Sequence, residues 1–292
     1  MDNIKKIWIL LPAFNEEESL PRLLPKLAEF CANEAQEYTI VVVNDGSLDS
    51  TLDYLQKNKS QFKIEILNHV INRGLGETER DGFEYISSVC DDNDVIIRMD
   101  CDDTHEPMYI PLHCQKMKDG FDVVISSRFQ KGGGQKGVNA YRSFISYCAN
   151  LFMKLLFPIS GVWDYSCGYR SYKGRIIKDA VRTYGNGFVQ LKGLGFTSTL
   201  ETIVKLRLLG ARFSEIPFVL RYDQKASPSK MISSITTLGY LTMAVLYHWP
   251  FSGWRRSYKG LKELYRSNPE EAVKAYNRFT IKRGLTTRIG GG

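Results

Sequence analysis

Short apolar runs alternate with longer, more polar segments through the first half of the chain. The runs are rich in β-branched residues and end in turn-forming residues, which is typical of buried strands. Strands that alternate with helices form βαβ units, so the pattern predicts an α/β fold with a mostly parallel sheet flanked by helices. The predicted strands span residues 5–11, 39–43, 63–70, 95–99 and 122–127, with the last strands within 212–222. The predicted helices span residues 16–30, with an acidic first turn, 74–89, 108–118, 141–157 and 196–209.

The segment from Met231 to Trp254 contains no Asp, Glu, Lys or Arg. Serines, threonines and a glycine dilute it, and its densest apolar part, 238–246, is too short to cross a bilayer. Ile235, Leu238 and Val245 fall on one helical face. The pattern therefore predicts an amphipathic helix, and it leaves open whether that helix lies on lipid or packs inside the protein.

The 292 residues carry a formal charge of +7, and residues 252–292 account for it with ten basic and three acidic side chains. The body of the chain is therefore nearly neutral. A basic tail is compatible with an anionic membrane surface, with nucleic acid or with plain solvation. No nucleic-acid-reading motif is present, so we expect no nucleic-acid partner. We predict a catalytic domain at 1–230, an interface helix at 231–254 and a basic tail at 255–292.

The six cysteines are far apart and form no Cys-x-x-Cys pair. The sequence therefore predicts neither a zinc site nor a disulfide framework. Free thiols are typical of a reducing compartment, so we expect a cytoplasmic protein that binds the membrane only peripherally. The apolar run at residues 7–14 is too short for a signal peptide and is interpreted as the first strand.

The fourth predicted strand ends in Asp100-Cys101-Asp102-Asp103. In an extended chain Asp100 and Asp102 point to the same side, so they can share one hard divalent cation with water and phosphate oxygens. Ligands bind at this edge of open α/β sheets. A lone Asp-x-Asp is more often a solvated acidic loop, and the rest of the chain decides between the two interpretations. A nicotinamide-binding site is disfavoured, because Glu79 occupies the third glycine position after Gly74-Leu75-Gly76.

Several further motifs accompany the acidic cluster in a fixed order. Together they make the chain resemble the inverting family 2 glycosyltransferases of the GT-A fold, and within them the dolichyl- and polyprenyl-phosphate hexose synthases. The resemblance runs from about Ile7 to Met231. Its motifs are Leu11-Pro12-Ala13-Phe14-Asn15-Glu16, Asn44-Asp45-Gly46-Ser47, Gly74-Leu75-Gly76, Asp100-Cys101-Asp102, Ser127-Arg128-Phe129, Arg142 with Ser146, Asp164 with Gly168-Tyr169-Arg170, and Ser229-Lys230.

The resemblance implies a donor site for a nucleotide diphosphate sugar, a GDP- or UDP-hexose of the mannose or glucose type. Asp100, Asp102 and Thr104 are expected to bind Mg²⁺ or Mn²⁺, which neutralises the leaving diphosphate. Cys101 lies between the two acids in the same site. Arg221 and Lys230 are expected to close over the diphosphate. The residues expected to hold the nucleoside are Pro12, Phe14, Glu16 and Asp45.

The resemblance also implies that Arg128, Arg142 and Ser146 receive the phosphate of a polyprenyl phosphate acceptor at the membrane. Two guanidinium groups and a hydroxyl suit a phosphate, and an arginine can bind it with two hydrogen bonds. The alternative is a pair of surface arginines and a serine inside a helix. With Asp102, the two arginines form the predicted catalytic set.

Two other functions remain open. An enzyme with a hydroxyl acceptor, such as a soluble glycan, would need a carboxylate as general base, and Asp103, Asp164 and Glu201 are the candidates. A phosphate acceptor would need no base, because a phosphate monoester with a second pKa of about 6 arrives already ionised. The third possibility is a nucleotide-binding protein without catalytic activity.

Overall fold

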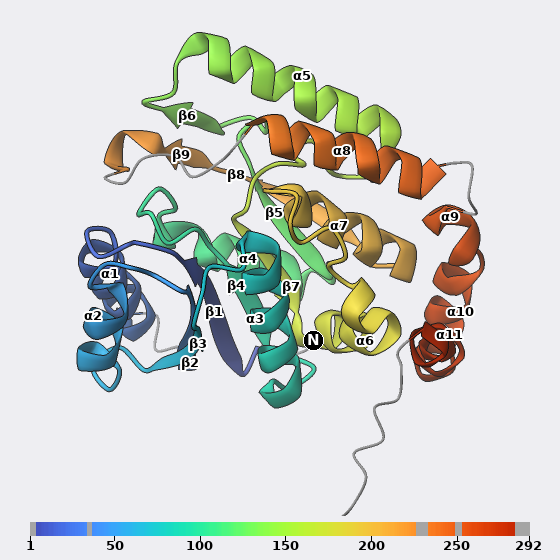
Figure 1. Cartoon of the computed structure of the whole chain (residues 1–292), viewed down its shortest axis with the longest axis horizontal. Coiled ribbons are helices and arrows are strands. Elements are labelled where there is room, and N and C mark those ends of the chain that lie inside the picture. The colour runs from blue at the N-terminus through green and yellow to red at the C-terminus, as the bar shows by residue number, and fades with distance from the viewer. Residues whose placement is uncertain (1–3, 34–36, 226–232, 249–252, 284–292) are drawn as a thin grey trace, which may run out of the picture.

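The computed structural model describes residues 4–33, 37–225, 233–248 and 253–283. A seven-stranded sheet runs through its centre in the order β3-β2-β1-β4-β7-β5-β8 (Figure 1). Only β7 is antiparallel to its neighbours, β4 and β5, so the predicted mostly parallel α/β sheet is confirmed. The strands are β1 (Lys6–Ala13), β2 (Glu37–Asp45), β3 (Ile64–His69), β4 (Val95–Arg98), β5 (Val123–Ser127), β6 (Gly134–Lys136), β7 (Arg170–Lys173), β8 (Phe213–Pro217) and β9 (Val219–Arg221).

Helices cover both faces of the sheet. Adjacent residues of β7 point to opposite faces, and they contact different helices. Tyr172 packs its ring on Phe83 of α3, whereas Ser171 bonds His113 of α4 at 2.8 Å. The α-helices are α1 (Leu20–Asn33), α2 (Thr51–Asn58), α3 (Leu75–Val89), α4 (Ile110–Lys118), α5 (Ala140–Leu156), α6 (Gly174–Tyr184), α7 (Thr197–Leu209), α8 (Ser233–His248), α9 (Trp254–Ser257), α10 (Leu261–Ser267) and α11 (Pro269–Arg283), and the 3₁₀ helices are η1 (Pro107–Tyr109), η2 (Gly185–Gly187) and η3 (Tyr222–Gln224).

The first helix begins later than the sequence predicts, at Leu20, and its first turn contains no acid. The chain turns first, because the carbonyl of Glu16 accepts from the backbone N–H groups of Ser19 and Leu20. Glu17 is used elsewhere: its carboxylate accepts from the backbone N–H of Ser50 at 2.9 Å. The Glu17 carboxylate therefore joins two loops instead of lying in the first turn of a helix.

The segment predicted as a basic tail is largely helical up to residue 283 and packs on the body of the protein. α11 lies against α6, and α10 lies against α7. Leu261 and Ala272 are fully buried there, and the hydroxyl of Tyr265 donates to Asp179 at 2.6 Å. Basic residues such as Lys262 and Lys274 thus lie on helices that pack on the body of the protein.

Helices α5 and α8 lie together along one side of the molecule (Figure 1). The ring of Phe157, directly after α5, packs on Tyr247 of α8 at 5.1 Å, and His248 contacts the carbonyl of Leu156 at 2.6 Å. No helix among the described residues combines the length and apolarity needed to cross a bilayer.

Candidate active site

A cavity of about 690 Å³ lies at the carboxyl edge of the sheet, where β1, β2 and β4 end. Open α/β sheets bind their ligands at this edge. Most of the side chains that the sequence assigns to a donor site meet here. The predicted site residues that line the cavity are Pro12, Phe14, Glu16, Asp45, Asp100, Cys101, Asp102, Thr104 and Arg142.

Asp100 and Asp102 both face the cavity, with 31% and 14% of their side chains exposed. A tight turn after β4 fixes them. The backbone N–H of Asp100 donates to Nδ1 of His105 at 2.9 Å, and the buried His105 ring stacks on Tyr169. The two acids of the Asp-x-Asp motif therefore share one site.

A buried arginine balances Asp100. The side chain of Arg98 is only 3% exposed, and it donates to Oδ1 of Asp100 while its Nε lies 2.8 Å from Oε1 of Glu79 on α3. Burial by itself would raise the pKa of Asp100, but the nearby Arg98 guanidinium outweighs it and lowers that pKa to about 2. Asp100 is therefore ionised at neutral pH.

Gly168 leaves room for this ion pair. A Cβ atom at Gly168 would overlap the Arg98 guanidinium and lie 3.2 Å from Oδ1 of Asp100. Only a residue without a side chain fits so close to the two charges. The glycine of the Gly168-Tyr169-Arg170 motif is thus explained by the acidic site that it touches.

Both carboxylate oxygens of Asp102 have partners. The hydroxyl of Thr104 donates to Oδ1 at 2.6 Å, and the ammonium of Lys225 contacts Oδ2. Burial by itself would lower the pKa of Lys225, but the contact with Asp102 outweighs it and raises the pKa above its usual value. Lys225 follows η3 directly and belongs to the site, although the sequence analysis did not assign it there.

The oxygens of Asp100, Asp102 and Thr104 are the hard donors that Mg²⁺ or Mn²⁺ prefers. Asp100 is held in its ionised form, and both acids face an open cavity. No group of three or more His, Cys, Asp and Glu side chains in the described part of the chain could enclose a metal ion. The residues therefore fit a cation that takes its remaining ligands from water and a bound diphosphate.

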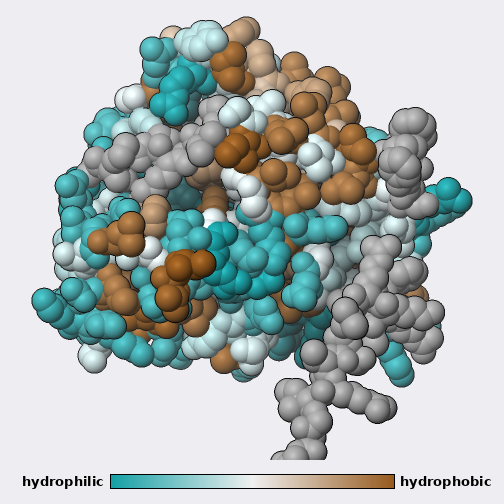
Figure 2. Space-filling view, viewed as in Figure 1, coloured by the Kyte–Doolittle hydropathy of each residue, from teal (hydrophilic) through white to brown (hydrophobic). Residues whose placement is uncertain are grey.

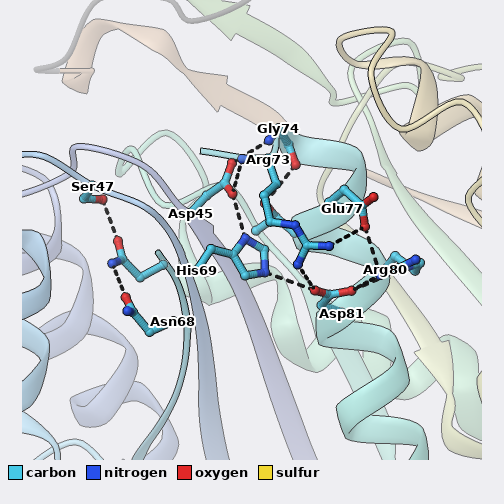
Figure 3. Close-up of polar contacts among 11 residues, drawn as sticks. Asp45, Ser47, Asn68, His69, Arg73, Gly74, Glu77, Arg80 and Asp81 are labelled. Atoms are coloured by element: carbon cyan, nitrogen blue, oxygen red, sulfur yellow. Dashed lines mark hydrogen bonds and ion pairs between the residues drawn. The ribbon is translucent and has the colours of Figure 1, made fainter. Parts of the chain in front are cut away.

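Asp45 occupies another wall of the cavity and organises the loop before α3 (Figure 3). Its carboxylate accepts from the backbone N–H groups of Arg73 and Gly74, both at 2.8 Å, and contacts Nδ1 of His69 at 2.7 Å. The Arg73 guanidinium turns to Asp81 of α3, at 3.0 Å. Asp45, which the sequence predicts to hold a nucleoside, thus also holds the loop that borders this wall of the cavity.

A second loop, residues 190–196, supplies cavity residues that the sequence analysis missed. Glu201 of α7 fixes it by accepting from the backbone N–H groups of residues 190 and 191, both at 2.9 Å. The ammonium of Lys192 donates to Glu77 of α3 at 2.7 Å. Gly76 allows this approach, because a Cβ there would lie 2.7 Å from the carbonyl oxygen of Lys192. The loop contributes Lys192, Gly193, Gly195 and Phe196 to the cavity.

Arg142 reaches the cavity from the first turn of α5. Its side chain is exposed, lies over the ring of Tyr222 and has its Nη1 3.5 Å from the Tyr222 hydroxyl. Ser146 follows one turn later on the same helix but does not line the cavity. Of the three residues predicted to receive a phosphate, Arg142 is the one that the structure places in the cavity wall.

Arg128 is engaged with the protein's own carboxylate. Its Nε and Nη2 each lie 2.7 Å from an oxygen of Asp164, which is fully buried, and only 12% of the Arg128 side chain is exposed. Burial by itself would raise the pKa of Asp164, but Arg128 outweighs it and lowers that pKa. Arg128 also donates to Ser166, which accepts from Asn150 of α5. This chain of contacts ties Arg128 to the helix that carries Arg142.

The three candidate general bases all lie outside the cavity lining. Asp103 is buried and pairs with Lys26 of α1 at 2.9 Å. Asp164 holds Arg128, and Glu201 holds the 190–196 loop. The structure thus gives each of these carboxylates a role in support of the fold or the site.

Neither of the two cations predicted to close over the diphosphate is among the described residues that line the cavity. Arg221 ends β9 and donates to Asp223 at 2.9 Å, outside the cavity lining. Lys230 lies outside the described residues.

Arg98 is a site residue that the sequence analysis did not assign, although the sequence contains a signal for it. A lone charge inside the apolar run 95–99 requires a buried partner.

The sequence profile of Glycosyl transferase family 2 matches residues 8–180, which include most of β1, all of β2 and β4, and the acidic turn. The chain belongs to this family. The glycosyltransferase predicted from the ordered motifs is therefore confirmed at the level of the family.

Two curated relatives of this family 2 glycosyltransferase match most of its length. The dolichol-phosphate mannosyltransferase of Pyrococcus furiosus is 28% identical over 237 residues, 81% of this chain and 62% of the relative. The undecaprenyl-phosphate mannosyltransferase of Micrococcus luteus is 27% identical over 231 residues, 79% of this chain and 89% of the relative. The chain thus spans less than two thirds of the Pyrococcus protein and most of the Micrococcus protein.

The solved structures that resemble this glycosyltransferase share its fold. Glucosyl-3-phosphoglycerate synthase of Mycobacterium tuberculosis, in complex with Mn²⁺, UDP and phosphoglyceric acid, has a TM-score of 0.56 at 15% identity and covers 85% of this chain and 81% of its own. TarS 1-349 of S. aureus has a TM-score of 0.52 at 15% identity and covers 96% of this chain and 76% of its own. The predicted GT-A architecture is confirmed.

Proposed function

We propose that this protein transfers a hexose from a nucleoside diphosphate sugar to a polyprenyl phosphate at a membrane surface. One observation carries the proposal: a single cavity joins the acids Asp100 and Asp102 to the guanidinium of Arg142, a residue in the first turn of helix α5, which has an exposed apolar face. A donor diphosphate with its cation and an acceptor phosphate can therefore meet in one space. The names of the two mannosyltransferase relatives agree with this acceptor class.

The residues suggest how the reaction proceeds. Asp100, Asp102 and Thr104 would hold a divalent cation, which when bound neutralises the leaving diphosphate. Arg142 would bind and orient the acceptor phosphate, whose oxygen forms a bond to the anomeric carbon as the bond from that carbon to the diphosphate breaks. The acceptor oxygen carries no proton to remove, because the phosphate is already ionised. This fits the engagement of Asp103, Asp164 and Glu201 in other contacts.

The test is the release of nucleoside diphosphate from GDP-mannose, GDP-glucose and UDP-glucose in detergent, with Mn²⁺ or Mg²⁺. We expect release with polyprenyl phosphate and none with the corresponding polyprenol, which has the same chain and a hydroxyl in place of the phosphate. Release with the alcohol would instead establish a hydroxyl acceptor. Binding of sugar nucleotides with no release under any condition would establish a protein without catalytic activity.

Arg142→Gln should raise the KM for polyprenyl phosphate about 10- to 100-fold, since a hydrogen bond to a charged group contributes about 1.5–3 kcal/mol. The KM for the sugar nucleotide should stay within about threefold of wild type, because the donor is held elsewhere. Lys154→Gln is the matched control: it removes a cation from the same helix, outside the cavity lining. Equal KM values for wild type and Arg142→Gln would refute the acceptor role of Arg142.

The membrane part of the proposal rests on the apolar surface of α5 and α8. Figure 2 shows hydrophobic residues gathered over these two helices. Seven side chains of α5 and three of α8 are between 43% and 73% exposed. The surface adjoins the cavity, since Arg142 and Ile235, which lie on the same two helices, line the cavity. The residues of this α5–α8 surface are Tyr141, Phe144, Ile145, Tyr147, Leu151, Phe152, Leu155, Leu238, Leu241 and Val245.

An exposed apolar patch of this kind marks a contact site. A bilayer would surround these apolar side chains, and the isoprenoid of the acceptor could stay in the lipid.

We expect the protein to float with phosphatidylglycerol liposomes in a density gradient. Leu151→Glu/Leu241→Glu, with one charge on each helix, should weaken binding at least about 100-fold. Met108→Glu/Leu112→Glu is the control, because these exposed side chains lie on η1 and α4, away from the α5–α8 surface. If the Leu151/Leu241 variant floats like wild type, another surface binds the membrane.

A further inference from the structure

Lys225 stands out among the cations of the cavity because it contacts an acid of the Asp-x-Asp motif from a distant part of the chain. Its ammonium lies on Oδ2 of Asp102, and only 11% of its side chain is exposed. Two other cavity cations have partners on helix α3: Lys192 contacts Glu77 and Arg73 contacts Asp81. One of the two acids proposed to hold the divalent cation is therefore already paired with a lysine.

This contact conflicts with metal binding. Oδ1 of Asp102 accepts from the hydroxyl of Thr104 at 2.6 Å and Oδ2 contacts the ammonium of Lys225, so a cation that binds through Oδ2 must displace that ammonium. An ammonium and a divalent cation repel each other strongly when they share one carboxylate oxygen in a partly buried site. Lys225 and the cation thus exclude one another at Oδ2.

The backbone that carries Lys225 is anchored up to η3. β9 pairs with β6, and the backbone N–H of Arg221 donates to the carbonyl of Thr104, in the acidic turn itself, at 3.1 Å. Gly137 packs so closely on this segment that a Cβ there would lie 2.6 Å from the backbone nitrogen of Asp223. The flexible four-carbon side chain of Lys225 can therefore move its charge within the cavity while the backbone stays in place.

We propose that Lys225 occupies Asp102 in the empty enzyme and passes to the donor diphosphate when the cation takes its place. The inference rests on the proposed donor site and adds an order of binding to it. One side chain opposes binding of the metal alone and supports binding of the metal together with a nucleoside diphosphate. The cation therefore binds together with the donor. Asp102 is paired with Lys225 before the donor binds and with the cation afterwards.

The two effects have opposite signs, which makes them separable in a binding experiment. In Lys225→Gln we expect Mn²⁺ alone, followed by the electron paramagnetic resonance signal of the free ion, to bind about tenfold more tightly than in wild type. UDP and GDP, titrated by calorimetry at saturating Mn²⁺, should bind about tenfold more weakly. Lys225→Arg keeps the charge, so it should bind Mn²⁺ alone as weakly as wild type.

Lys136→Gln is the matched control, since it removes a lysine from β6, the partner of the strand β9 that leads to Lys225, and Lys136 lies outside the cavity lining. It should reproduce both wild-type affinities. The inference is overturned if Lys225→Gln matches wild type in Mn²⁺ affinity, or if it weakens metal and nucleotide binding alike. Wild-type protein that binds neither nucleotide in the presence of Mn²⁺ would instead refute the proposed function, so the two failures are distinguishable.

Discussion

Asp102→Asn is expected to lower the rate of sugar transfer by at least about 10³-fold, since the loss of a cation that neutralises the leaving group costs several kcal/mol of barrier. The substitution keeps the shape of the side chain and replaces a charged oxygen by an amide. The measurement is nucleoside diphosphate release under saturating donor, acceptor and Mn²⁺. Binding of Mn²⁺ together with UDP or GDP should also weaken, because Asp102 faces the cavity and is one of the two acids proposed to hold the cation.

Asp103→Asn provides the neighbouring control. Asp103 pairs with Lys26 outside the cavity, and its backbone has φ 63°, a conformation that asparagine tolerates. Its activity should stay within about tenfold of wild type, whereas a general base would lose far more. Equal large losses in the two variants would point to a role of Asp103 in proton removal and hence to a hydroxyl acceptor. Full activity of Asp102→Asn would refute the cation site.

The sheet and its acidic edge were predictable because they depend on short-range patterns. The run 95–99 is apolar except for Arg98 and is followed at once by the acids, so it predicts a buried strand that leads into an acidic turn. The alternation of strands and helices then brings the carboxyl ends of β1, β2 and β4 to one edge. Asp45 and Asp100 lie on the same cavity for this reason.

The partners of the site residues were not predictable in the same way, because they come from distant segments. Lys225 meets Asp102 across 123 positions of sequence, and Lys192 meets Glu77 across 115. No periodicity within a segment encodes such a contact. Arg128 was identified from its sequence motif. The motif alone does not tell whether the guanidinium faces a ligand or, as in this structure, the carboxylate of Asp164. Side-chain partners decide that question.

Residues 255–292 were predicted as a basic tail, and the structure describes this segment as far as residue 283. Their basic residues suggested a tail, yet Trp254 and Leu261 are buried and α11 covers α6. Trp254 also lies over the buried ammonium of Lys205, at 4.1 Å, and Lys205 lies 3.4 Å from Glu201, which fixes the 190–196 loop. The C-terminal helices thus support a wall of the cavity through a buried ion pair.

Arg98→Met is expected to lower the free energy of unfolding by about 3–5 kcal/mol, the usual cost of removing one partner of a buried ion pair. Methionine fills a similar space but leaves Glu79 and Asp100 without their cation. Chemical denaturation at pH 7 measures the loss. Arg212→Met is the control, because that arginine is 59% exposed and pairs with Asp122 at 3.5 Å, so its loss should cost about 1 kcal/mol or less.

The pH dependence separates lost charge from lost packing in Arg98→Met. In wild type the lowered pKa of Asp100, about 2, means that its stabilising contribution is present above the unfolded pKa and disappears as the pH falls toward 2. Without Arg98, burial raises that pKa, so protonation at low pH relieves the variant. The difference in unfolding free energy should therefore shrink between pH 7 and pH 4, and Arg98→Met/Glu79→Gln should recover part of it at pH 7. A difference that is constant with pH, with no recovery in the double variant, would show that packing and not charge makes Arg98 necessary.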